Sequence, residues 1–231
     1  MLDILKDKKV IFFDVGYTLD YPASGNWMLT NRFYDAVGDR LECISKEEFT
    51  EGFNVCVKRL LKKHKVRNMN EEYLQFVSFY TDISEYFKLG LSLDEVNQIA
   101  YDRTYNMKNY IPYTDTKMVV RELSYSYKLG IISDTWPSIE PQLDALGVNS
   151  YFSFRTYSFM IGALKPDKRM YIDALKKSGC EAQETVFIDD SLDNLKGAAE
   201  YGITPILIAA NPASDVDAPF FKIHSLTELM R

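Results

Sequence analysis

The pattern of apolar and polar residues divides the chain into three stretches. In the first, the apolar run Val10–Phe13 stops at Asp14 and is followed by a turn that contains glycine, which predicts a buried strand with a carboxylate at its end. From Asn26 to about Met107, apolar residues recur at helical spacing, with three breaks that supply turn and N-cap residues. This second stretch therefore predicts four helices packed as a small bundle.

After Pro112 the pattern alternates between helix and strand. It predicts strands at 129–133, 152–157, 185–189 and 205–209, helices at 114–127, 138–146, 166–179 and 192–201, and a last short helix after the capping-box pattern at 225–228. Such alternation predicts a parallel sheet with helices on both faces, which binds ligands beyond the carboxyl ends of its strands. We therefore expect an α/β core domain of residues 1–20 and 108–231, with an inserted α-helical cap at 21–107.

Composition narrows the class of partner. The 231 residues are 46% hydrophobic and 26% charged, which is typical of a globular protein that can bury a core without disulfides. A formal net charge of −6 argues against nucleic acids and anionic membranes, because both attract positive charge. A small molecule is the expected partner, and no pattern indicates the oligomeric state.

The cysteines and the N-terminal residues give information about the cellular location. The three cysteines are widely spaced and form no CxxC, so neither a disulfide framework nor a cysteine-built zinc site is indicated. Residues 1–9 include acids, and no apolar run in the sequence approaches the length of a membrane span, which predicts neither a signal peptide nor a transmembrane helix. These features favour a cytoplasmic protein.

Polar residues follow the predicted strands at the carboxyl edge of the sheet. They are Asp14, Ser133 with Asp134, Lys165, and Asp189 with Asp190. Taken singly, each suits an ordinary cap, turn or solvated side chain. Taken together, a carboxylate, a hydroxyl, a cation and an acidic pair describe a site for a metal-bound phosphoryl group. Mg²⁺ is the expected metal, because it favours oxygen ligands and is often shared between carboxylates and phosphate.

Four sequence motifs resemble those of the haloacid dehalogenase-like superfamily. They are Asp14-Val15-Gly16-Tyr17-Thr18-Leu19, Ile131-Ile132-Ser133-Asp134, Lys165-Pro166-Asp167, and Phe187-Ile188-Asp189-Asp190-Ser191-Leu192-Asp193-Asn194. Each alone is weak, but the four in this order, with a helical insert between the first and second, are specific. The resemblance implies a Rossmann-like parallel-sheet core with an inserted helical-bundle cap.

The resemblance also implies roles for these residues. Asp14 would be the nucleophile that forms a phosphoaspartyl intermediate. Ser133 would donate a hydrogen bond to a phosphoryl oxygen, and Lys165 would neutralise charge around Asp14 and the phosphoryl group. The remaining implied roles are Mg²⁺ binding by Asp14, the backbone carbonyl of Gly16, Asp190 and Asp189, and phosphate binding by Ser133, Asp134, Lys165 and Asn194.

Gly16 departs from the pattern of the family's phosphatases. Those enzymes have an aspartate there, which protonates the leaving oxygen, and losing such an acid typically costs about 10²–10⁴ in rate. We favour a Mg²⁺-dependent phosphatase of a small phosphorylated metabolite, with a substitute acid from the helical cap or from Asp20, or with substrates whose leaving group needs no proton. The alternatives are a 2-haloacid dehalogenase-like hydrolase, which lacks that aspartate and works without metal, and a non-catalytic phosphate- or metal-binding relative.

Other features carry less weight. The segment Asp14–Thr18 also resembles the phosphate loop of actin-like kinases, but that fold requires antiparallel strands next, where this chain predicts helices. His64 and His224 have no second His or Cys at ligand spacing, so both are expected to be structural or exposed. For Trp136, which follows the second motif, pocket lining and ordinary packing are equally good interpretations.

Overall fold

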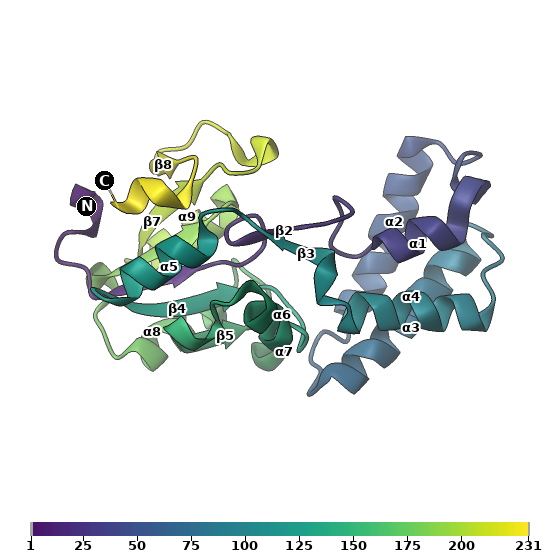
Figure 1. The fold of residues 1–231 in the computed structure, drawn as a ribbon, viewed down its shortest axis with the longest axis horizontal. Coiled ribbons are helices and arrows are strands. Elements are labelled where there is room, and N and C mark those ends of the chain that lie inside the picture. Colours follow the sequence, from purple (N-terminus) through teal and green to yellow (C-terminus); the bar gives the residue numbers. More distant parts are fainter. Residues whose placement is uncertain (1, 231) are drawn as a thin grey trace. The chain divides into compact units, whose positions relative to one another are not determined.

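The chain folds into two compact units, seen in a computed structural model that describes residues 2–230 (Figure 1). The α/β unit contains the N-terminal segment up to Tyr21, Ile111–Thr135, and the chain from Ile139 onward. The helical unit contains Pro22–Tyr110 and also Trp136–Ser138. The sequence placed the helical insert at 21–107. It gave no indication that three residues after the second motif would join the helical unit.

The α/β unit is built on a parallel sheet of six strands in the order β5-β4-β1-β6-β7-β8. The strands are β1 (Val10–Phe13), β4 (Lys128–Ser133), β5 (Phe152–Tyr157), β6 (Thr185–Asp189), β7 (Thr204–Ile208) and β8 (Phe221–Ile223). β1 is central, pairs with β4 and β6, and has all four side chains buried. The predicted fold class is therefore confirmed, and β8 is an additional edge strand.

Five helices accompany the sheet: α5 (Thr116–Ser124), α6 (Ile139–Leu146), α7 (Ser158–Ile161), α8 (Lys168–Ser178) and α9 (Leu192–Glu200). Val10 and Phe12 form an apolar cluster with side chains of α8 and α9. Because side chains alternate along a strand, Phe13 points to the opposite face from Phe12. Its ring packs edge-on against that of Phe152, with 6.1 Å between the ring centroids. Because all four side chains of β1 are buried, both faces of the strand are covered. The last predicted helix is a short 3₁₀ segment, Leu226–Met230.

The helical unit has the four expected helices: α1 (Asn31–Val37), α2 (Lys46–Leu61), α3 (Met69–Tyr86) and α4 (Leu93–Tyr105). Ser45 and Ser92 begin α2 and α4 with complete capping boxes, which satisfy amides that have no partner inside the helix. A second sheet pairs the short strands β2 (Asp20–Pro22) and β3 (Tyr110–Pro112), where the chain passes between the units. No helix in residues 2–230 has the length and apolarity needed to cross a membrane.

Candidate active site

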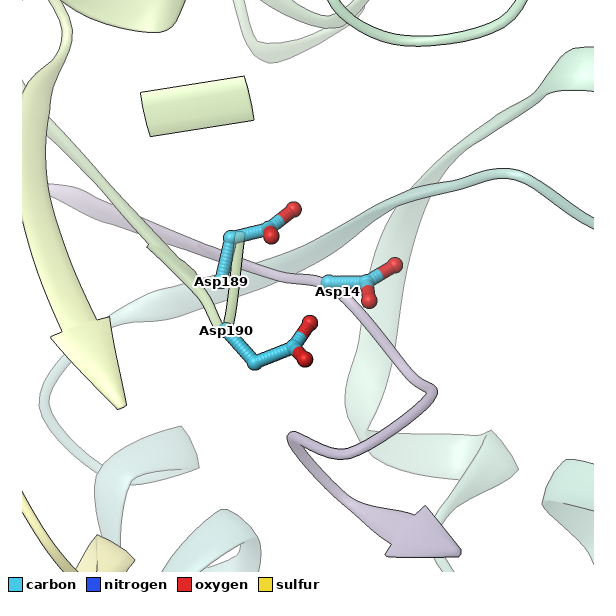
Figure 2. Close-up of side chains that lie close together, drawn as sticks. All are labelled: Asp14, Asp189 and Asp190. Atoms are coloured by element: carbon cyan, nitrogen blue, oxygen red, sulfur yellow. The ribbon is translucent and has the colours of Figure 1, made fainter. Parts of the chain in front are cut away.

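Three carboxylates meet at the carboxyl edge of the sheet. Asp14 directly follows β1, and its amide donates to the carbonyl of Ile188 in β6 at 2.9 Å. Asp189 ends β6 and Asp190 follows it. One oxygen from each of Asp14, Asp189 and Asp190 lies within 4.8 Å of the other two. Figure 2 shows the three side chains lying close together. Within residues 2–230 this is the one group of three acidic, His or Cys side chains that could hold a metal ion.

Lys165 is the cation of this group. Its Nζ lies 2.8 Å from Oδ1 of Asp14 and 2.7 Å from Oδ2 of Asp189, and its side chain is only 2% exposed. The backbone N–H of Lys165 donates to Asp134 at 2.9 Å, which ties the lysine's loop to the end of β4. Burial alone would lower the pKa of Lys165, but the carboxylates of Asp14 and Asp189 raise it above its ordinary value. Lys165 is therefore a permanent positive charge.

Asp189 has already used its hydrogen-bonding capacity within the protein. Its Oδ1 accepts from the backbone N–H of Ser191 at 2.7 Å, and Asn194 lies 3.1 Å from both of its oxygens. Its Oδ2 also accepts from Lys165. Asp190 accepts a hydrogen bond from the hydroxyl of Ser214 at 2.9 Å. Asp14 and Asp190 are thus better available to a ligand than Asp189, and the Asn194 side chain orients Asp189.

The charge balance suits a bound cation. Three carboxylates face one ammonium group, so the cluster carries excess negative charge. Burial, followed by the nearby charges of Asp14 and Asp189, raises the pKa of Asp190 to about 7. A divalent cation would relieve this repulsion, and a set made only of oxygen donors matches Mg²⁺. The residues present therefore fit the expected metal.

Ser133 occupies the position that the sequence predicted. It is the last residue of β4, is 3% exposed, and pairs in register with Tyr157 of β5. Phe13 pairs with Ile131 on one side and with Ile188 on the other, so Asp14, Ser133 and Asp189 reach the same edge of the sheet. The contact of Ser133 and Asp134 with a phosphoryl group stays a prediction.

The loop after Asp14 folds back, so that its first residues pair with Asp20. The backbone N–H of Tyr17 donates to the carbonyl of Asp20 at 2.7 Å, and Gly16 bridges to Asp20. Tyr17 has a φ of 55°, a left-handed conformation that is uncommon for a residue with a side chain and often occurs at functional sites. The strain sits beside Gly16, whose backbone carbonyl is a predicted metal ligand.

Asp20, the suggested substitute acid, is enclosed. It is 0% exposed, and its Oδ2 accepts from the side chain of Gln142 at 2.6 Å. Burial raises its pKa to about 8, so the carboxyl is mostly protonated at neutral pH. It holds a proton, but in this conformation it presents no surface to a substrate.

Two supporting residues have no signal in the sequence. Ser214, in the loop after β7, donates to Asp190, and Gln142, in α6, donates to Asp20. Both are brought to the site by tertiary packing from segments outside the four motifs. A serine in a loop and a glutamine in a helix are too common for either position to be singled out from one sequence.

Comparison with known proteins adds independent evidence. The family profile described as "Haloacid dehalogenase-like hydrolase" matches residues 47–208. A glyceraldehyde 3-phosphate phosphatase of Methanopyrus kandleri is 30% identical over 130 residues, which cover 52% of this chain and 55% of that protein. The chain therefore spans about half the length of the curated relatives it matches.

Solved structures share the fold along nearly the whole chain. A HAD phosphatase from Thermococcus onnurineus superposes with a TM-score of 0.62 at 25% identity and covers 96% of this chain and 95% of its own. A 2-haloacid dehalogenase from Pseudomonas syringae also gives 0.62, at 20% identity, with 96% of both chains covered. The match at 20% identity reports the fold alone. On the profile match, the four motifs and the fold, this chain belongs to the haloacid dehalogenase-like hydrolases.

Proposed function

We propose that this protein is a Mg²⁺-dependent phosphatase that acts on a small phosphorylated metabolite. The observation that carries the proposal is the cluster of Asp14, Asp189 and Asp190 around Lys165 at the carboxyl edge of the sheet. The phosphatases among the relatives support this choice, since two of them are named for phosphoester hydrolysis. The acidic cluster also argues against a dehalogenase, because that reaction on carbon needs no metal.

In the proposed reaction, a carboxylate oxygen of Asp14 attacks phosphorus and the bond from phosphorus to the ester oxygen breaks. The leaving group keeps that electron pair and takes a proton from solvent. Water then attacks the phosphoryl group on Asp14, which releases inorganic phosphate and restores the carboxylate. Each step conserves atoms and charge without an acid at position 16.

The surrounding residues would stabilise charge during these steps. Lys165, held by Asp14 and Asp189, would offset negative charge on the transferring oxygens, and Ser133 would donate a hydrogen bond to one of them. Asp14, Asp190 and the backbone carbonyl of Gly16 would hold Mg²⁺, which supplies further positive charge at the phosphoryl group. Asp189 would fix Lys165 in place through its own bonds to Ser191 and Asn194.

The helical unit would serve as the cap. In this proposal its side chains exclude water during transfer and select the substrate. Gly16 cannot act as a general acid. The favoured substrates are therefore those whose leaving group departs without a proton.

The test is phosphate release from a panel of small phosphoesters, measured with Mg²⁺ and with EDTA. We expect release that requires Mg²⁺ and is lost in Asp14→Asn. Asp193→Asn is the matched control, because Asp193 lies in the same motif as Asp190 but its side chain is 80% exposed. Equal release by the wild type and Asp14→Asn would contradict the proposal. Halide release from 2-haloacids without metal would instead identify a dehalogenase, and Mg²⁺ or phosphate binding without turnover a non-catalytic relative.

A further inference from the structure

The helical unit contains a buried charge pair that the proposed reaction does not use. The side chains of Glu72 in α3 and Arg103 in α4 are 0% and 6% exposed, and Oε1 of Glu72 lies 3.7 Å from Nη1 of Arg103. The Arg103 guanidinium lies 4.6 Å from the ring centroid of Phe76 and 5.8 Å from that of Trp136. Removing two charges from water costs several kcal/mol per ion unless hydrogen bonds compensate, so the partners of Glu72 are informative.

Those partners come from a segment far along the chain. Ser138 donates its backbone N–H to Oε2 of Glu72 at 2.7 Å and its hydroxyl to Oε1 at 2.6 Å. Three residues after Glu72 in α3, the side chain of Gln75 accepts from Nε1 of Trp136 at 2.8 Å. α3 therefore binds both ends of Trp136–Ser138, which explains why these three residues belong to the helical unit.

This segment is short and firmly attached on its upstream side. Ser133 ends β4, and Asp134 accepts from the backbone N–H of Lys165. Thr135 donates its N–H to the hydroxyl of Ser158 at 2.8 Å and accepts from it at 3.2 Å. Because residues 134 and 135 are hydrogen-bonded, they have little freedom to move. A displacement of Ser138 is therefore transmitted along the backbone to Ser133.

The downstream side leads to the same site. α6 begins at Ile139, immediately after Ser138, and its Gln142 donates to Asp20 in the loop that follows Asp14. The residues held by Glu72 therefore stand between the end of β4 and the helix that supports the first motif.

We propose that Glu72 is a positioning residue for the phosphate-binding end of β4. By holding Ser138, it fixes residues 134–138 and, through them, the hydroxyl of Ser133. This inference rests on the proposed function in that it takes Ser133 as a phosphate ligand. Hydrogen bonds to a carboxylate are stronger than those between neutral groups, so two of them from one residue make a firm anchor.

Two variants and one control test the proposal. Ser138→Ala deletes one hydrogen bond and leaves the buried charge pair intact, whereas Glu72→Gln removes the charge at nearly constant size. Glu85→Gln is the control, because Glu85 lies in the same helix and is exposed. The measurements are hydrogen exchange of individual backbone amides by NMR, and the dissociation constant for inorganic phosphate in the presence of Mg²⁺.

We expect faster exchange at residues 133–136 and 138 in both variants, since Pro137 has no amide hydrogen. We also expect a dissociation constant for phosphate raised about tenfold, the scale of one lost hydrogen bond to a charged group. The control should change neither. Unchanged phosphate affinity in a folded variant, or faster exchange confined to 136–138, would show that Glu72 only stabilises the helical unit.

The two proposals fail in different ways. If the wild type neither binds phosphate nor releases it from any phosphoester, the proposed function is wrong, while exchange at residues 133–135 still decides whether Glu72 positions the strand end. If Glu72→Gln does not fold, the comparison of Ser138→Ala with the control decides.

Discussion

At the scale of single residues, the proposed reaction depends on Gly16, which stands where the family's phosphatases have an aspartate. Its φ is outside the left-handed region, which the neighbouring Tyr17 adopts instead. The φ at position 16 therefore does not itself require glycine. This makes the missing acid a matter of chemistry that a single substitution can probe.

We predict that the wild-type enzyme depends strongly on its leaving group. Aryl phosphates, whose leaving oxygen departs without a proton, should be hydrolysed much faster than alkyl phosphates. Gly16→Asp should raise kcat for alkyl phosphates, by at most about 10²–10⁴, the usual value of a positioned acid. The measurement is kcat for aryl and alkyl phosphates, each with saturating Mg²⁺. An equal loss of activity on both substrates, with weaker Mg²⁺ binding, would mean that the glycine is needed for space.

Ser214 is a second residue whose effect is local. Its hydroxyl donates to Oδ2 of Asp190 at 2.9 Å, and Asp190 is a predicted metal ligand of the carboxylate cluster. Groups that orient metal ligands typically contribute about 10–100-fold to metal affinity. Ser214→Ala should weaken Mg²⁺ binding by that range in a calorimetric titration, and Ser214→Thr, which keeps the hydroxyl, should restore most of it. Equal Mg²⁺ affinity in all three proteins would contradict this assignment.

At the scale of elements, α9 is placed by a close approach that only glycine permits. A Cβ at Gly197 would lie 2.7 Å from Cβ of Pro166 and 3.0 Å from the hydroxyl of Tyr171. Tyr171 is itself bonded to the backbone carbonyl of Asn194 at 2.8 Å. The contact therefore sets the distance between α9, which carries Asn194, and the loop that carries Lys165.

We predict that Gly197→Ala destabilises the protein by about 1–3 kcal/mol, the usual cost of overpacking. The sign of the change in the free energy of unfolding is informative, because replacing glycine by alanine in a helix otherwise stabilises a protein by roughly 0.5–1 kcal/mol. Urea unfolding would measure the change, with Lys196→Ala in an exposed part of the same helix as the control. A stabilised Gly197→Ala variant would show that α9 can move away without cost.

The longer elements could be predicted from sequence because their periodicity is strong. The central strand, the four helices of the insert and the alternating helices and strands after Pro112 were all anticipated. The short elements β2, β3, β8 and α7 were not, since three or four residues carry no periodic pattern. The positions of Asp14, Lys165, Asp189 and Asp190 followed from the motifs.

The different environments of Asp189 and Asp190 could not be predicted from the sequence. Asp189 and Asp190 are adjacent and chemically identical, and only the structure shows that Asp189 is saturated by Lys165, Ser191 and Asn194. The membership of Trp136–Ser138 in the helical unit likewise depends on contacts with Glu72 and Gln75 of α3, which lie more than sixty residues earlier in the chain. Tertiary contacts of this kind leave no trace in one sequence.

At the scale of the whole molecule, we expect the charge of the acidic cluster to make stability depend on pH and on a bound metal. The folded-state pKa of Asp190 is raised to about 7, so its carboxyl contributes stability at low pH that is lost as pH rises from about 4 through 7. Above that range the metal-free protein carries unrelieved repulsion.

We therefore predict that, at pH 8 with EDTA, Asp190→Asn is more stable than the wild type by roughly 2–4 kcal/mol. Mg²⁺ at about 1,000 times its dissociation constant should cancel this difference, because it then stabilises the wild type by about 4.1 kcal/mol and the variant hardly at all. Urea unfolding with and without Mg²⁺ measures both effects. If the wild type is the more stable protein in EDTA, the repulsion is relieved within the protein itself.

The central place of β1 in the sheet has a consequence for how the protein is made. Its neighbours β4 and β6 are encoded more than a hundred residues later, whereas Pro22–Tyr110 of the helical unit is continuous. At about 5–20 residues per second, β1 emerges from the ribosome roughly ten to thirty seconds before β6. During that time Val10–Phe13, which are fully buried in the folded protein, have no sheet to join, so we expect the nascent strand that leads to Asp14 to be prone to aggregation.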